Sequence, residues 1–135
     1  MRQIKFRAWL KNFQKMVDVV EIDFLEGCIV WIYDDYINQE QIKEVDKFED
    51  IILMQYTGIK DKNGVEIYEG DVIKTDDNHK FKVIWDETRF IGVDSVRDGN
   101  GYICYIDSHY KDGKSRLEII GNIYDNPELM GANND

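Results

Sequence analysis

The feature that most constrains the fold of this chain is an alternation of apolar and polar residues, which glycine and Asn/Asp turns interrupt at short intervals. Alternation with a period of two is typical of half-buried strands, and strands repeated every ~8–12 residues are typical of small barrels and sandwiches. The pattern predicts a mainly β fold, whose first three strands form an antiparallel meander. The expected strands are 2–10, 16–24, 28–33, 52–57, 65–68, 71–75, 80–85, 89–93, 102–106 and 117–124.

The stretch DKNGVEIYEGDVI at 61–73 contains two glycines and four acids, which raises the question of a phosphate or calcium loop. A phosphate loop would lead into a helix, and a calcium loop needs oxygen ligands at alternate positions. Here Gly64 is followed by alternating strand residues, and Ile67 stands where a calcium ligand would be expected. The pair Asn63-Gly64 tolerates the positive φ that tight turns need. The sequence therefore predicts a hairpin.

One segment has the periodicity of a helix. Ile42, Val45 and Phe48 recur at intervals of three residues, and Asn38 is a residue type that caps helix starts. These residues predict one short, acidic helix at about 39–50.

The C-terminal residues predict a final helical turn. Asn126 can cap it, and Pro127 occupies the first helical position, where proline is favourable. Residues 131–135 are expected to be frayed, and the glycine-rich segment 97–101 is expected to be a polar loop.

The charge argues against a broad affinity for nucleic acid. The chain of 135 residues carries 17 basic and 27 acidic residues, a net charge of −10, whereas nucleic acids and anionic membranes attract a positive field. Residues 1–15 contain five basic residues and no acid, and residues 16–50 contain eleven acids. We expect the basic N-terminal strand to lie against the acidic part of the same fold or of a neighbouring subunit; a small basic binding site is the alternative.

The cysteine and hydropathy patterns predict a soluble cytoplasmic protein. Cys28 and Cys104 lie far apart within apolar runs, as expected for buried thiols in a reducing compartment. No apolar run approaches the ~20 residues needed to span a membrane, so no membrane partner is expected. The N-terminal MRQIKFRAWL lacks the apolar region and cleavage site of a signal peptide.

The sequence shows no catalytic or metal-binding constellation. A zinc site needs three or four converging ligands, and His79 and His109 are the two histidines of the chain. Cys104 precedes His109 by five residues, which in a continuous strand would place them on opposite faces of the sheet. We expect no catalytic residue, no metal and no cofactor. An enzymatic function would require a pocket that gathers carboxylates or a histidine together.

Two segments contain the candidate surface residues. Trp9 follows basic residues on the polar face of the first strand, a pattern shared by sites that stack single-stranded bases and by subunit contacts. Polar residues within 53–57 could satisfy buried backbone groups or line a surface groove. The candidate partner or oligomer surface comprises Lys5, Arg7, Trp9, Gln55, Tyr56 and Thr57.

Four stretches are similar to a known family: IKFRAW at 4–9, LMQYTGIKDKNGVEIYEGDVI at 53–73, VIWD at 83–86 and LEIIGNIYDNPEL at 117–129. Together they resemble the YopX-like family of phage and prophage proteins from one end of the chain to the other. The segments 17–51 and 87–115 depart from the pattern, and we transfer nothing to them.

The resemblance implies an SH3-like small barrel at 53–130. The N-terminal meander and short helix precede it at 1–52, and we expect the two parts to form one compact unit. It also implies a phage or prophage protein in the bacterial host cytoplasm that self-associates and has no assigned activity.

Two functions are consistent with these patterns. The first is a non-enzymatic accessory protein that binds itself and a host or phage protein. The alternative is a nucleic-acid-binding module that uses the N-terminal basic-aromatic strand. The acidic net charge favours the first.

Overall fold

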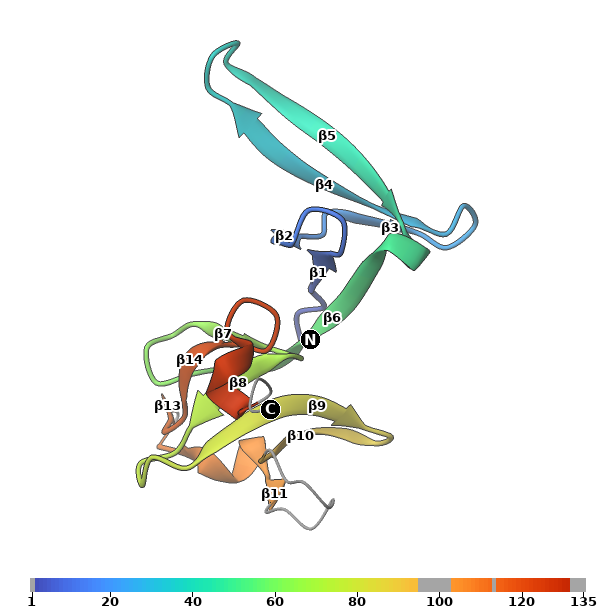
Figure 1. Cartoon of the computed structure of the whole chain (residues 1–135). Helices are drawn as coiled ribbons and strands as arrows, with labels where there is room; N and C mark the ends of the chain where they lie inside the picture. Colours follow the sequence, from blue (N-terminus) through green and yellow to red (C-terminus); the bar gives the residue numbers. More distant parts are fainter. Residues whose placement is uncertain (1, 95–102, 113, 132–135) are drawn as a thin grey trace. The chain divides into compact units, whose positions relative to one another are not determined.

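A computed structural model of the chain describes residues 2–94, 103–112 and 114–131 (Figure 1). The chain divides into two compact units. The N-terminal unit comprises Ile4–Gln55, and the C-terminal unit comprises Tyr56–Asp135 together with Met1–Gln3. This boundary lies close to the predicted division between 52 and 53. The expectation that both parts form one compact unit stays a prediction.

The described residues form strands and 3-10 helices with no α-helix among them, so the prediction of a mainly β fold is confirmed. The strands of the N-terminal unit are β1 (Phe6–Leu10), β2 (Lys15–Asp18), β3 (Glu21–Asp23), β4 (Cys28–Asp35) and β5 (Glu40–Lys47). β6 (Ile51–Lys60) begins in the N-terminal unit and ends in the C-terminal unit. The remaining strands are β7 (Glu66–Tyr68), β8 (Asp71–Lys74), β9 (Lys80–Asp86), β10 (Arg89–Val93), β11 (Ile103–Cys104), β12 (Tyr110–Lys111), β13 (Lys114–Ser115) and β14 (Glu118–Asn122). The 3-10 helices are η1 (Phe48–Asp50), η2 (Ile106–His109) and η3 (Pro127–Met130).

The strand predicted at 16–24 divides into β2 and β3, which belong to different sheets. β2 pairs with β1, and β3 pairs with β4. The division falls between two neighbouring amides: Val19 donates to the carbonyl of Phe6 at 3.1 Å, and Val20 donates to that of Val30 at 2.9 Å. The N-terminal antiparallel meander therefore consists of β3, β4 and β5, and not of the first three predicted strands.

The helix predicted at about 39–50 is wrong over most of its length. β5 pairs with β4 from Cys28↔Lys47 to Asp35↔Glu40, and the helical residues are confined to η1. An isolated helix of about twelve residues is marginal in water, whereas pairing satisfies the backbone groups of the apolar strand β4. Asn38 lies in the hairpin turn, where its amide donates to the Asp35 carboxylate at 3.3 Å.

Each unit has its own apolar core. The core of the N-terminal unit forms where β1 and β2 meet β4 and β6, and it comprises Ala8, Leu10, Val17, Ile29, Trp31 and Ile51. The core of the C-terminal unit comprises Ile67, Ile73, Phe81, Val83, Cys104, Ile106 and Leu117. Alternate residues of β9 and β4 enter these cores, as their periodicity predicts.

The C-terminal unit is built on an antiparallel sheet of order β11-β10-β9-β8-β14, which curls into a half-barrel (Figure 1). The hairpin predicted at 61–73 is confirmed: the amide of Asp61 donates to the carbonyl of Val65 at 2.7 Å, and Gly64 has a φ of +82°. The C-terminal helical turn is confirmed as η3. The side chain of Asn126 does not cap it, however, and instead accepts a hydrogen bond from the amide of Asn122 at 3.2 Å.

Two predictions fall outside the described residues. These are the polar loop at 97–101 and the frayed end at 131–135, of which residue 131 alone is described.

Candidate functional site

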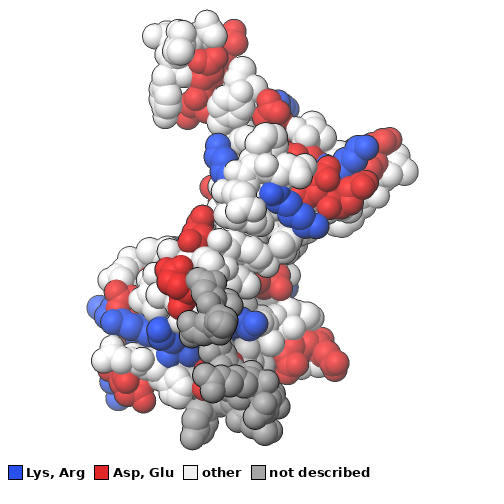
Figure 2. All heavy atoms as spheres, in the orientation of Figure 1, with Lys and Arg blue, Asp and Glu red and all other residues white. Residues whose placement is uncertain are grey.

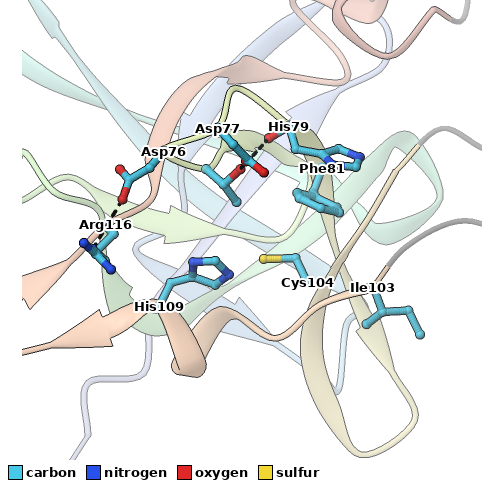
Figure 3. A pocket seen from close by; sticks show the side chains of 9 residues that line it. Asp76, Asp77, His79, Phe81, Ile103, Cys104, His109 and Arg116 are labelled. Atoms are coloured by element: carbon cyan, nitrogen blue, oxygen red, sulfur yellow. Dashed lines mark hydrogen bonds and ion pairs between the residues drawn. The ribbon is translucent and has the colours of Figure 1, made fainter.

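A pocket of about 580 Å³ lies in the C-terminal unit, beside the turn between β8 and β9 (Figure 3). The turn itself and the first buried residue of β9 form one wall. β11, the end of η2 and the residue after β13 form the other. The lining residues are Thr75, Asp76, Asp77, His79, Phe81, Ile103, Cys104, His109 and Arg116.

The floor of the pocket is apolar because two core side chains reach it. Phe81 and Cys104 are both buried, and the ring of His79 stacks on that of Phe81 with centroids 4.6 Å apart. Gly92, on the neighbouring strand β10, permits this arrangement. A Cβ atom at that position would lie 2.8 Å from Phe81 Cβ, closer than real Cβ atoms pack, and 3.2 Å from Cys104 Cβ, which is tighter than most Cβ contacts.

The rim of the pocket carries charge. Arg116 Nε lies 3.3 Å from Asp76 Oδ2, and both side chains are more than half exposed. The hydroxyl of Thr75 donates to the carboxylate of Asp77. That hydrogen bond is the main reason why the pKa of Asp77 lies below its usual value of 3.8, so Asp77 is ionised at neutral pH.

Cys104 and His109 line the same pocket, contrary to the expectation that they face opposite sides of a sheet. The strand β11 ends at Cys104, and η2 then turns the chain back, so strand spacing does not apply between the two residues. Figure 3 shows the sulfur of Cys104 and the ring of His109 directed into one hollow. Burial raises the pKa of the Cys104 thiol to about 11. At neutral pH it is therefore a protonated thiol and a poor nucleophile.

The same residues do not make a metal site. Among the residues that the structure describes, no three His, Cys, Asp or Glu side chains converge closely enough to hold a metal ion. What the pocket offers is a set of hydrogen-bonding and charged groups around an apolar floor, an arrangement suited to binding.

The candidate surface residues of the N-terminal strand differ in their exposure to solvent. Lys5 is exposed and Arg7 is half-buried, but Trp9 is only 6% exposed. Both faces of the second half of this strand are buried, because Ala8, Trp9 and Leu10 are all shielded from solvent. An indole in this position cannot stack on a base without rearrangement.

The predicted residues of β6 have mainly packing roles. Tyr56 is buried, and its ring lies 5.6 Å from that of Tyr68, its neighbour on β7. The hydroxyl of Thr57 accepts a hydrogen bond from the amide of Ile59 at 3.2 Å, which satisfies a backbone group beside Gly58. Gln55 is partly exposed. The predicted residues and the pocket-lining residues thus form separate sets.

Two further basic residues of the N-terminal strand and turn contact their own unit. Lys11 donates to the backbone carbonyl of Glu49 at 3.1 Å, and the ammonium of Lys15 lies 5.1 Å from the centre of the Trp31 ring. A pairing of this basic strand with acidic side chains stays a prediction.

A second candidate surface is the part of the β4–β5 ribbon that extends past the core, which we call the arm (residues 32–43). Figure 1 shows the ribbon reaching beyond β1 and β2. At its tip, Tyr36 is 84% exposed and Ile37 is 93% exposed. In Figure 2 the end of the arm, at the top of the view, carries uncharged surface beside a strip of carboxylate atoms. The helical interpretation of 39–50 concealed this feature, although the apolar run at 28–33 was visible in the sequence.

Among the residues that the structure describes, there is no helix with the length and hydrophobicity that a membrane crossing requires.

The fold and the site define a mainly β protein of two compact units, with a pocket in one unit and an arm in the other that exposes apolar residues at its tip. The chain belongs to the YopX protein family, whose model matches residues 5–131, so the resemblance of the four sequence stretches is confirmed. It is also similar to the solved structure of protein EF1440 from Enterococcus faecalis, with 27% sequence identity and a TM-score of 0.61. That similarity covers 96% of this chain and 99% of the other. No curated protein is significantly similar to it in sequence.

Proposed function

We propose that this chain is a non-enzymatic, self-associating protein-binding module that serves a phage or prophage in the bacterial cytoplasm. The phage origin rests on the resemblance of its motifs to the YopX-like proteins of phages and prophages. The binding function rests on the exposed apolar residues of the arm. The half-barrel is SH3-like in this proposal, and such barrels present aromatic-lined loops to peptides.

The non-enzymatic character is supported by the chemistry of the pocket. Cys104 is a protonated thiol there, because its pKa is raised to about 11. Asp76 is paired with Arg116, and Asp77 accepts a hydrogen bond from Thr75. The pKa of Asp77 is lowered, whereas a general acid at neutral pH needs a raised pKa.

The arm has the composition of an interaction surface. An isolated two-stranded ribbon is marginally stable in water, and large exposed apolar residues add a cost that a partner removes. Tyr33, Tyr36, Ile37 and Val45 are exposed on or beside this ribbon. Tyrosine is enriched in protein interfaces because it combines apolar area with a polar end. Binding through the arm would cover these residues.

The outer face of the ribbon suits a second copy of the chain. Val30 and Val45 lie opposite each other, and they face away from the side that carries the buried Ile29 and Trp31. The next row across the three strands consists of Asp23 on β3, Cys28 on β4 and Lys47 on β5. It therefore has an acid at one edge and a base at the other. If a second copy stacks on this face by a two-fold rotation along the strands, Lys47 of each copy lies over Asp23 of the other. The opposite charges of that row are then complemented, Val30 of one copy lies over Val30 of the other, and Glu21 of each copy lies over Val45 of the other.

Sedimentation velocity over a concentration series tests this proposal with two matched variants. Val45→Glu introduces a charge that would lie over Glu21 of the other copy, and Val65→Glu introduces the same charge in the Asn-Gly hairpin, where Val65 is comparably exposed (52%, against 61% for Val45). We expect the wild-type chain and Val65→Glu to associate and Val45→Glu to remain monomeric. A wild-type chain that is monomeric at all concentrations, or a Val45→Glu variant that associates as the wild type does, would contradict self-association through this face.

The nucleic-acid alternative receives less support. Its stacking residue, Trp9, is buried, and the net charge of −10 repels a polyanion.

A further inference from the structure

We infer that the pocket beside the β8–β9 turn binds a cationic side chain, a lysine or an arginine, presented by a partner protein. This inference deepens the protein-binding function proposed above and rests on it. It assigns to the pocket a ligand chemistry of its own, separate from the arm.

The size of the pocket is suitable for a peptide side chain with its flanking backbone. Its volume of about 580 Å³ falls within the range of roughly 300–1,000 Å³ that ligand pockets occupy. The pocket is open on one side, between the turn and η2 (Figure 3), so a segment of a partner can enter without a rearrangement of the sheet.

The charge of the rim favours a cation. Two carboxylates, Asp76 and Asp77, face one guanidinium, that of Arg116, so the lining has a negative net charge when both imidazoles are neutral. Arg116 already pairs with Asp76 at 3.3 Å. Asp77 is ionised, and the hydroxyl that binds it carries no charge. Its negative charge is therefore available to an incoming cation, whereas an anionic ligand would be repelled.

The floor favours a cation on an aliphatic stem over a small inorganic ion. Lysine and arginine bury their methylene groups along apolar surface while the charged end reaches polar partners. Phe81 and the protonated thiol of Cys104 provide such a surface below the rim. A purely apolar ligand would fill the floor but would remove water from Asp77 without replacing its hydrogen bonds, which is costly.

The net charge of the whole chain also favours a cationic ligand. A net charge of −10 attracts cationic partners and raises their rate of encounter, especially at low salt.

A titration of the ¹⁵N-labelled chain at low salt tests this inference. The probes are two peptides that differ at one residue, acetyl-Ala-Leu-Arg-Leu-Ala-amide and its counterpart with Glu in place of Arg. We expect the Arg peptide to shift the amide signals of Thr75, Asp77, Cys104 and His109, and the Glu peptide to leave them unchanged. Equal shifts with both peptides, or shifts confined to residues outside the pocket, would overturn the inference.

Three variants sharpen the test. Asp77→Asn should weaken binding of the Arg peptide at least about fivefold, equivalent to about 1 kcal/mol. Arg116→Gln should strengthen it, because the variant removes the cation that competes for Asp76. Asp86→Asn, an exposed change on β9 outside the pocket, is the matched control and should leave affinity unchanged. If Asp77→Asn binds as tightly as Asp86→Asn, the pocket is not a cation site.

The peptide titration and the self-association experiment test separate parts of the protein, so one can fail while the other succeeds. Val45→Glu should bind the Arg peptide as the wild-type chain does, because Val45 lies in the N-terminal unit and the pocket residues lie in the C-terminal unit. Failure of self-association with retained peptide binding would overturn self-association through the outer face of the β4–β5 ribbon alone. Self-association without peptide binding would overturn the pocket inference alone.

Discussion

The carboxylate of Asp61 accepts a hydrogen bond from the backbone amide of Ile119 at 3.0 Å, across 58 residues of sequence. Its other oxygen accepts from the amides of Asn63 at 2.8 Å and Val65 at 2.9 Å. Asp61 is only 5% exposed. A single buried carboxylate thus fixes the Asn-Gly turn and attaches it to β14, and it links two of the four stretches that carry the family resemblance.

Replacing Asp61 by Ala should lower the free energy of unfolding by about 3 kcal/mol, because three backbone amides lose their acceptor in a buried site. Urea unfolding measures the change. Asp86→Ala, an exposed change, is the control and should stay within about 0.5 kcal/mol of the wild type. Equal stabilities of the two variants would show that the three hydrogen bonds contribute nothing net.

The strand conformation of 40–47 has a direct energetic test. The indole Nε1 of Trp31 donates to Asp46 Oδ2 at 2.8 Å, and this contact exists because the two residues lie on one face of the β4–β5 ribbon. A double-mutant cycle with Trp31→Phe and Asp46→Ala should give a coupling energy of about 1 kcal/mol. The cycle of Trp31→Phe with Lys43→Ala, on the opposite face, should give none. Coupling absent from the first cycle would contradict the observed register.

Backbone conformation alone should make Gly64 hard to replace. Gly64 has a φ of +82°, and a Cβ atom there would meet nothing within 4 Å, so the cost of a side chain comes from the dihedral angle and not from a clash. Gly64→Val should destabilise the fold by on the order of 1 kcal/mol or more, and Gly64→Asn by less, because asparagine tolerates positive φ. Thermal melts of both variants measure this. A Val variant that melts with the wild type would remove the dihedral argument.

The Cys104 thiol should make stability fall at high pH. Its pKa rises from 9.0 to about 11 on folding, so between these values the unfolded chain has lost a proton that the native chain retains. Stability then decreases as pH increases through this window and is unaffected by this group below it. Denaturation of the wild type and of Cys104→Ala should show a difference in stability that shrinks between pH 9 and 11. A constant difference would mean that the native thiol titrates normally.

Residue patterns within single segments predicted much of the fold. The strand predicted at 2–10, the hairpin at 61–73 and the turn at Pro127 depend on the residues within each segment, and the structure has all three, the strand over Phe6–Leu10. Within the hairpin, Asp61 accepts hydrogen bonds from the amides of Asn63 and Val65, which lie two and four residues further along the chain. Its contact with Ile119 was not visible, because it depends on which distant strand closes the sheet.

The errors share a cause. The segment 39–50 has a weak helical period, and the unpaired edge of β4 outweighed it. Cys104 and His109 were placed on opposite faces by a spacing rule that η2 invalidates. Trp9 was placed on a polar face, and the structure buries both faces of β1 at that point. In each case structure outside the residue pattern decided the outcome: the neighbouring strand β4, the intervening helix η2, and the packing around β1.

The sequence by itself determined the mainly β class, the family and the positions of the tight turns, because period, glycine placement and side-chain capping act within a few residues. The tertiary structure alone decided that 40–47 is a strand, that the strand at 16–24 divides between two sheets, and that Asp77, Cys104 and Arg116 line one pocket. These features depend on pairing and packing between distant segments, whose free energies exceed the local preferences of about 1 kcal/mol or less per residue that a sequence pattern reports.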